Sequence, residues 1–167
     1  MKQLAVLALS LVLAQVSFAS ESPQPKMGIG LGIPYGFLGV NAELPLNNVF
    51  SVSTGAGVGV EKPAFAVGAH LNTPSGNSNL TPRLSVYASN AVAAMEVCEF
   101  SFYSNGSCEF EQFGGTAFGF GLVSTHFHME LLVTNSPAFE DRKDELEEQG
   151  AEFEEGNNFA LVLAYRF

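Results

Sequence analysis

Residues 159–167 read FALVLAYRF, and large and small side chains alternate along the whole stretch. A period of two sustained over nine residues predicts a β-strand. One face of this strand carries only bulky apolar side chains, and the other carries smaller ones and an arginine. The bulky face consists of Phe159, Leu161, Leu163, Tyr165 and Phe167.

The same alternation recurs upstream in seven segments, which are 27–33, 38–44, 50–60, 65–72, 83–89, 117–123 and 126–134. Opposite each bulky face lie Gly, Ala, Ser, Thr, Asn and a few ionisable groups. A soluble barrel or sandwich would carry many more charges on its solvent face. Small, weakly polar residues suit the interior of a narrow barrel whose bulky face meets lipid. We therefore predict an eight-stranded antiparallel up-and-down transmembrane β-barrel.

Composition excludes several other classes of protein. The chain has 167 residues, a net charge of −10, 47% hydrophobic residues and only 14% charged ones. Its length suits one domain, and its charged fraction is low for a soluble domain. Seven Lys and Arg residues are too few for extended nucleic-acid binding. The aromatic content argues against a disordered acidic chain.

The N-terminal segment has the features of an export signal. Lys2 supplies a positive charge, residues 4–16 are almost wholly apolar, and Ser17 and Ala19 are small. This pattern predicts a secretory signal peptide over residues 1–19. The barrel domain would then occupy residues 20–167. No later run reaches the ~18 apolar residues of a transmembrane helix.

Export bears on the two cysteines, Cys98 and Cys108. In an oxidising compartment they can pair, and Asn105-Gly106 between them is a turn signal. A disulfide here would staple a small loop, with a stabilisation of roughly 2–3 kcal/mol in the chain-entropy model. Their spacing fits no metal site. We favour this stapled loop over a redox-active pair.

The connections between the predicted strands differ in length according to the end of the barrel. If both ends of the barrel chain lie in the periplasm, the periplasmic turns are 45–48, 73–80 and 124–125. The outer connections are then 34–36, 61–63, 91–115 and 135–157. Both long connections, about 91–115 and 135–157, fall on the outer side, as in outer-membrane barrels.

The export signal, the glycine-interleaved strands and the strand 159–167 together resemble the small eight-stranded outer-membrane barrels of Gram-negative bacteria. This is the class of the OmpA transmembrane domain and OmpX. The resemblance implies a location in the bacterial outer membrane, in contact with lipid and lipopolysaccharide. It also implies that Phe159, Tyr165 and Phe167 form the signal that the barrel-assembly machinery reads. The class includes structural proteins, adhesins, small pores and a few lipid-modifying enzymes, so the fold does not fix the activity.

Seven ionisable groups are expected to face the lumen. Buried charges persist only when they are paired, so we predict a network of ion pairs and hydrogen bonds that closes the lower barrel. The alternative is that the same groups gate water, ions or protons, with histidines titrating near a pH of about 6.5. The seven are Glu43, His70, Arg83, His126, His128, Glu130 and Arg166.

Three of these residues, His126, His128 and Glu130, alternate along one strand and would share a face. They could bind zinc, or serve as a general base with Ser85 or Ser89 as nucleophile. Outer-membrane lipid A deacylases place Ser, His and Glu on the lipid-facing wall, whereas this trio is expected to face inward. We therefore predict no catalytic residue, no bound metal and no cofactor. A lipid-modifying hydrolase is the remaining enzymatic alternative.

The two long connections differ in character. Residues 140–155 hold nine acids against Arg142 and Lys143. Ser136-Pro137 could start a short helix with Phe139, Leu146 and Phe153 on one side. We predict a solvated acidic loop, with a surface binding element or a diffuse divalent-cation site as the alternative. The other connection has aromatics that predict an exposed contact surface, an upward hairpin extension of the strands, or both: Phe100, Phe102, Tyr103, Phe110 and Phe113.

These observations favour a structural or surface-interaction protein that presents its two long connections to an extracellular ligand. The runner-up is a narrow pore for ions or small solutes. A rival from another class is a secreted soluble β-sandwich, such as a pilus subunit, which also carries a disulfide and a hydrophobic final strand.

Overall fold

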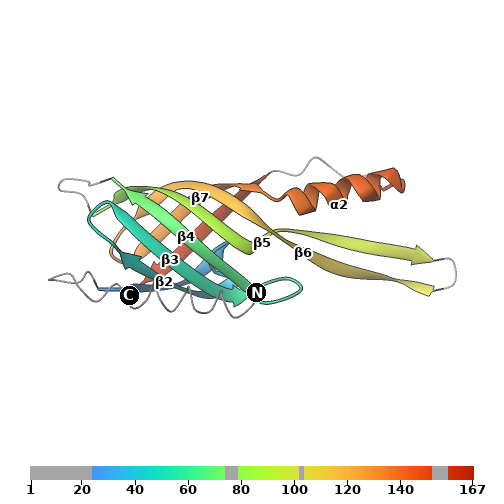
Figure 1. Cartoon of the computed structure of the whole chain (residues 1–167). Helices are drawn as coiled ribbons and strands as arrows, with labels where there is room; N and C mark the ends of the chain where they lie inside the picture. The colour runs from blue at the N-terminus through green and yellow to red at the C-terminus, as the bar shows by residue number, and fades with distance from the viewer. Residues whose placement is uncertain (1–23, 74–78, 102–103, 152–157) are drawn as a thin grey trace, which may run out of the picture.

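In the computed structural model, which describes residues 24–73, 79–101, 104–151 and 158–167, one sheet closes into a barrel (Figure 1). Every strand pairs antiparallel with its neighbours in the chain, and β1 closes on β8. The predicted fold class is confirmed. The sandwich alternative is wrong, because a single sheet closes on itself. The strands are β1 (Lys26–Gly32), β2 (Gly36–Pro45), β3 (Phe50–Val58), β4 (Ala64–Asn72), β5 (Thr81–Ser101), β6 (Ser104–Val123), β7 (Phe127–Asn135) and β8 (Phe159–Arg166).

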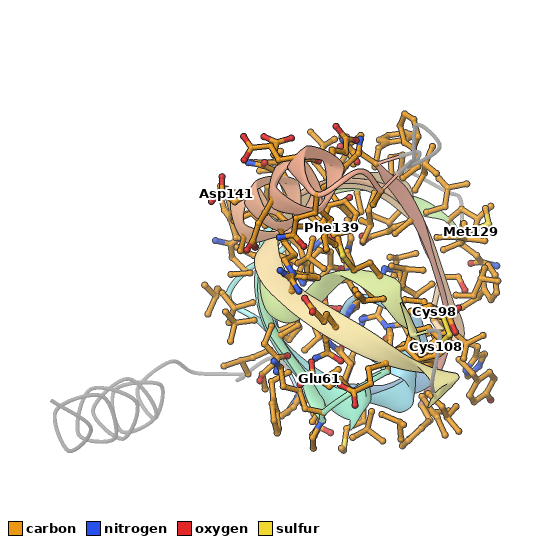
Figure 2. The ribbon with its side chains drawn as sticks, turned by 90° about the vertical axis from the view of Figure 1, so that its right-hand side faces the viewer. Glu61, Cys98, Cys108, Met129, Phe139 and Asp141 are labelled. Carbon is orange, nitrogen blue, oxygen red and sulfur yellow. A yellow bond between two sulfur atoms is a disulfide. The ribbon has the colours of Figure 1, made fainter. Side chains whose placement is uncertain are left out.

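The two faces of the sheet match the predicted alternation. Bulky apolar side chains point outward, as Met129 does in the end-on view of Figure 2. Phe65, Phe118 and Phe159 are each 58–59% exposed to the surroundings of the barrel. The inward face carries buried small residues and the buried ionisable groups. The barrel thus has an apolar outer face and buries its ionisable groups, the inverse of a soluble protein.

The barrel has two unlike ends. One end, here called the turn end, carries the short connections 46–49, 73–80 and 124–126. At this end Phe167 and Met27 exchange backbone hydrogen bonds of 2.9 and 3.2 Å, which extends the β1–β8 seam. The opposite end, here called the hairpin end, carries both long connections (Figure 1). The expected grouping of the long connections is therefore present.

Strands β5 and β6 continue far beyond the barrel wall. Pairing of β4 with β5 ends at Ser89, and pairing of β6 with β7 ends at Thr116. Beyond these points β5 and β6 pair only with each other, as far as Ser101 opposite Ser104. Residues 91–101 and 104–115 therefore form a two-stranded hairpin, which is the second of the two readings of this aromatic segment.

Helix α2 (Pro137–Glu148) fills most of the other long connection and runs beside the hairpin (Figure 1). It begins after Ser136 and ends before Gly150, whose φ of 93° suits a residue without a side chain. None of its side chains is buried. In the part of the chain that the structure describes, no helix is long and apolar enough to cross a membrane. The predictions for residues 1–19 and for Phe153 fall outside the described residues.

Candidate functional site

The connection between β1 and β2 folds back into the barrel instead of projecting outward. Ile33 and Tyr35 are 5% and 1% exposed, and the turn is closed by a 2.7 Å hydrogen bond from Tyr35 N to Gly32 O. Positive φ values at Gly32 (102°) and Gly36 (65°) allow the reversal. The connection expected as a short outer loop therefore lies inside the lumen, and we call residues 33–35 the inserted turn.

Glycines on the inner faces of β2 and β3 make room for the inserted turn. A Cβ on Gly55 would lie 1.8 Å from the Pro34 carbonyl oxygen, and one on Gly57 would lie 1.9 Å from that of Tyr35. Such distances are impossible, so any side chain here would displace the turn. The glycine-rich inner face of β2 and β3 thus accommodates backbone from another part of the chain.

At the turn end, one carboxylate holds two arginines. Both Glu43 oxygens accept hydrogen bonds from Arg83, at 2.6 and 3.0 Å, and Oε2 also accepts one from Arg166 Nη2 at 2.8 Å. Arg83 Nε donates to Asn72 Oδ1 at 2.8 Å. The three charged residues are at most 5% exposed. They close the floor of a vestibule of about 800 Å³ that opens at the turn end.

A second cluster lies around Glu130, which is fully buried. Its oxygens accept hydrogen bonds from Ser85 Oγ (2.5 Å) and Tyr87 Oη (2.7 Å). His128 Nε2 lies 3.1 Å from Glu130 Oε1, close enough for an ion pair but without hydrogen-bond geometry. These contacts compensate much of the cost of burying a carboxylate.

His70 links the wall to this cluster. Its Nδ1 is 2.9 Å from Ser85 Oγ and its Nε2 is 2.8 Å from Ser53 Oγ. Ser53, His70, Ser85 and Glu130 thus form a continuous chain of hydrogen bonds. A histidine beside two hydroxyls resembles the parts of a hydrolase, but all four residues are at most 9% exposed. No substrate could reach them without opening the barrel.

Six of the seven expected lumen groups are buried inside the barrel, and His126 is not. It lies in the turn before β7, where Ser124 Oγ accepts hydrogen bonds from the backbone of His126 and Phe127. Its ring stacks on the exposed Tyr165, with centroids 5.9 Å apart. Regular alternation begins only at Phe127, so His126 does not share a face with His128 and Glu130. The expected trio is not assembled.

Above these polar layers the lumen is filled by an apolar core. Tyr35 and Tyr87 pack there with Leu132 and Val162, all at most 1% exposed. The lumen is therefore closed in succession by a salt-bridge layer, a hydrogen-bonded layer and an apolar layer. Each layer draws residues from several strands, so only the closed barrel can assemble it.

Outside the barrel, α2 docks on the hairpin through a few defined contacts. Arg142 donates to both oxygens of Glu111, at 3.0 and 3.1 Å, and to Glu145 at 2.7 Å. Its hydrogen bonds to Glu111 and then to Glu145 raise the pKa of Arg142 above its ordinary value. Phe113 and Phe139 meet edge to face at 5.6 Å. We call the hairpin (91–115) together with α2 the platform.

The start of α2 is tied to the barrel wall. The Ser136 side chain, predicted to start the helix, donates instead to the Gly114 carbonyl at 2.8 Å and makes no helix cap. The base of the hairpin is fastened on its other side by Asn90. Its side chain accepts from Phe65 N at 2.7 Å and donates to Pro63 O at 2.9 Å.

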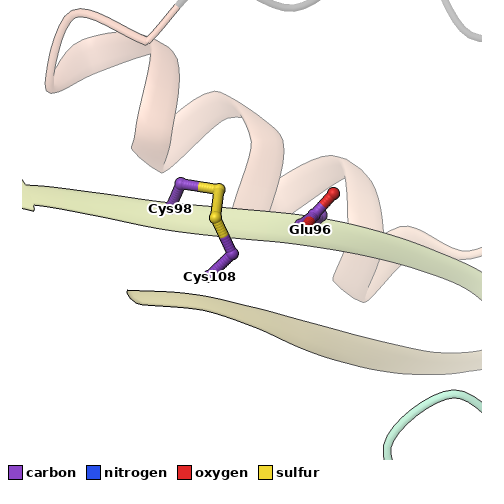
Figure 3. A group of neighbouring side chains, drawn as sticks. All are labelled: Glu96, Cys98 and Cys108. Carbon is purple, nitrogen blue, oxygen red and sulfur yellow. A yellow bond between two sulfur atoms is a disulfide. The ribbon is translucent and has the colours of Figure 1, made fainter. Parts of the chain in front are cut away.

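The predicted disulfide is confirmed within the hairpin. Cys98 and Cys108 lie directly opposite each other in the register and are bonded, with Glu96 beside them (Figure 3). The three side chains are close enough to surround a metal ion. Disulfide sulfurs carry no thiolate charge, so only the carboxylate remains as a good ligand. The group therefore serves as a staple.

The aromatic residues of the expected assembly signal lie on the outer face of β8 and at its end. Phe159, Tyr165 and Phe167 are each 55–67% exposed. In the hairpin, Phe110 is 48% exposed, whereas Phe113 contacts α2. The side chains of Phe100, Phe102 and Tyr103 lie outside the described residues.

Comparison with known proteins gives little beyond the fold. No family model and no curated protein matches the chain. Among solved structures, the chain is similar to the N-terminal β-barrel domain of Pseudomonas aeruginosa OprF. Sequence identity is 13% and the TM-score is 0.46, over 88% of this chain and 100% of that one.

Proposed function

We propose that this protein is a bacterial outer-membrane β-barrel that anchors the platform at the cell surface. The observation that carries this proposal is the inverted barrel, in which exposed Phe, Leu and Val surround buried, paired charges. An exposed apolar surface of this extent on a soluble monomer would drive aggregation. In a bilayer the same belt is the stable arrangement.

The barrel acts as an anchor and not as a pore. The inserted turn and the Glu43 and Glu130 clusters occupy the lumen at successive levels. Eight strands leave room for side chains and little else. A narrow pore, the runner-up, would require the turn or the ion pairs to move. We expect no discrete current steps from the wild-type barrel in a planar bilayer.

The platform is the part that would meet a partner. Thirteen of the 17 acidic residues and two of the seven basic ones lie in the connections 91–115 and 135–157, a net charge of −11 there. This charge suits a cationic extracellular partner, or divalent cations that bridge it to lipopolysaccharide phosphates. The role is one of structure and surface interaction. No catalytic step is proposed, because the only serine–histidine chain described is buried.

Fractionation of a Gram-negative host that expresses the precursor tests this proposal. The protein should be found in the outer membrane, and its band on a denaturing gel should shift when the sample is boiled. Protease added to intact cells should cut within the platform and leave the barrel whole. A soluble periplasmic protein without a gel shift would overturn the anchor. Protection of the platform in intact cells would overturn its outward orientation.

A further inference from the structure

An apolar cavity of about 380 Å³ lies at the hairpin end, above the inserted turn. Seven of its 13 lining residues are Gly or Ala, and the others are apolar except for one glutamine. Its walls come from the β1–β2 turn, the β3–β4 loop, the base of the hairpin and the start of β8. The volume falls in the range of small-molecule sites, which are ~300–1,000 Å³ and largely apolar.

The cavity lies at a notch in the barrel wall. The register pairs β1 with β8 only over Gly28–Leu31 and Leu163–Arg166. Because residues 33–35 turn into the lumen, β1 does not continue alongside the first residues of β8. Ala160, in that part of β8, lines the cavity together with Leu31 and Ile33. The inserted turn therefore fills the lumen, and it leaves the first residues of β8 without a β1 partner in the wall.

The lining runs continuously from the outer surface to the interior. Leu31 and Phe37 are 48% and 65% exposed, as are other members of the outer apolar belt. Ile33 and Val92, which also line the cavity, are 5% and 8% exposed and belong to the apolar core. A molecule already in contact with the outer belt could thus enter the cavity without crossing a polar surface.

Water is a poor occupant of this cavity. The one polar side chain among the described lining residues is Gln112, and both ends of its amide are used. Its Oε1 accepts from Val60 N at 3.1 Å, and its Nε2 donates to Asn90 O at 3.2 Å. Ordered water needs two to four polar partners, which these apolar walls do not offer. A hydrocarbon chain would restore the dispersion contacts that an empty space forfeits.

We propose that this notch holds one acyl chain of a lipid from the surrounding bilayer. The chain would lie between the inserted turn and the base of the hairpin. The inference rests on the proposed membrane location and adds a lipid-binding site to it. The lipid would pack against Ala160 and Val60 and fill the break in the wall. A filled break would in turn hold the base of the platform.

The absence of tryptophan from the chain provides a clean test. A single reporter, Val60→Trp, is introduced into the cavity wall, with Ala91→Trp, at another half-buried lining residue, as a second reporter in case the first does not fold. Each variant is reconstituted in phosphatidylcholine vesicles with or without bromine on the acyl chains. Phe118→Trp, an exposed position on the outer face of β6, serves as the membrane control.

If the proposal holds, brominated chains should reduce the fluorescence of the cavity reporter as much as that of Phe118→Trp. Adding Ala160→Leu, which fills the notch, should abolish most of that loss. The matched change Ala138→Leu, on the exposed surface of α2, should leave the loss intact. Acrylamide, a water-soluble quencher, should have little effect on the cavity reporter.

The outcomes separate the two proposals. Quenching of Phe118→Trp by bromine without quenching of either cavity reporter overturns the acyl-chain site and leaves the membrane anchor standing. Strong acrylamide quenching of the cavity reporters overturns the site in favour of a water-filled or solute-filled cavity. Absence of bromine quenching at Phe118→Trp overturns the membrane location itself.

Discussion

Charged side chains inside the barrel and those on the platform are partnered in different ways. In the lumen, Glu43 and Glu130 each have two or more close partners and are at most 5% exposed. On the platform, acids greatly outnumber bases, and Arg142 is the one arginine among them. Its side chain is 30% exposed. A charge in the lumen must have a partner because its burial removes it from water. A charge on the platform is solvated and screened by salt, so it can remain without one.

The difference shows that one chain can use charge for two purposes. Paired charges in the lumen help to specify which strands meet, because each ion pair joins positions far apart in the sequence. Unbalanced charge on the platform contributes little to folding and sets which molecules can approach it. Substitutions in the two regions should therefore differ sharply in their cost.

The largest effect is expected from Glu43→Gln. This change leaves Arg83 and Arg166 buried beside a neutral amide, and breaking a buried ion pair costs about 3–5 kcal/mol. The free energy of unfolding in detergent micelles, from urea titration followed by gel shift, should fall by that order. Glu111→Gln, which removes the platform partner of Arg142, is the matched control and should leave the midpoint unchanged. Equal midpoints for both variants would contradict the contrast.

A smaller but still large effect is expected from Gly55→Ala. The new Cβ would overlap the Pro34 carbonyl oxygen, so the turn must shift or leave the lumen. Overpacking of this kind costs about 1–3 kcal/mol. An expelled turn should also produce current steps in a planar bilayer. Gly114→Ala, where the nearest atom would be 3.1 Å away, should stay stable and silent. A stable, non-conducting Gly55→Ala barrel would show that the turn does not close the lumen.

Sequence alone predicted the eight barrel strands because each separates two different environments. Alternation is strongest where one face meets lipid and the other meets the lumen, as in residues 159–167. It fades in residues 91–101, which continue beyond the barrel wall and no longer separate lipid from lumen, so the extension of β5 was only one of two readings. The same alternation placed the six ionisable groups that are buried on the inward face of their strands.

Two features of the candidate site could not be predicted from the alternation of side chains. The inserted turn was missed because glycines at 39, 55 and 57 look the same whether they line water or make room for backbone. Their position against Pro34-Tyr35 becomes visible only in the folded barrel. His126 matched the alternation of β7 although the strand begins one residue later. The Ser124-Thr125 turn directly before it indicated that His126 could belong to the turn and fit the alternation by chance.

The disulfide should stabilise the platform without stabilising the barrel. In the chain-entropy model a loop of this size is worth roughly 2–3 kcal/mol, but beyond Ser89 the hairpin pairs only with itself. The double change Cys98→Ser and Cys108→Ser should therefore speed proteolysis within 91–115. The urea midpoint of the barrel should remain that of the wild type. A lower barrel midpoint would show that the two regions fold as one unit.

The smallest effect is expected from Arg142→Gln, which removes the bidentate contact between α2 and Glu111. The helix has no basic residue in its last turn and no buried side chain, so it depends on this contact and on Phe139. Amide hydrogen exchange in α2 should become faster while the barrel strands keep their protection. Because the pair is partly exposed, high salt should weaken it in the wild type and reduce the difference between the two proteins. Lys143→Gln, whose partner Glu147 lies on the same helix, should leave docking intact. Unchanged exchange in Arg142→Gln would mean that the Phe113–Phe139 contact and the tether at Ser136 hold α2 unaided.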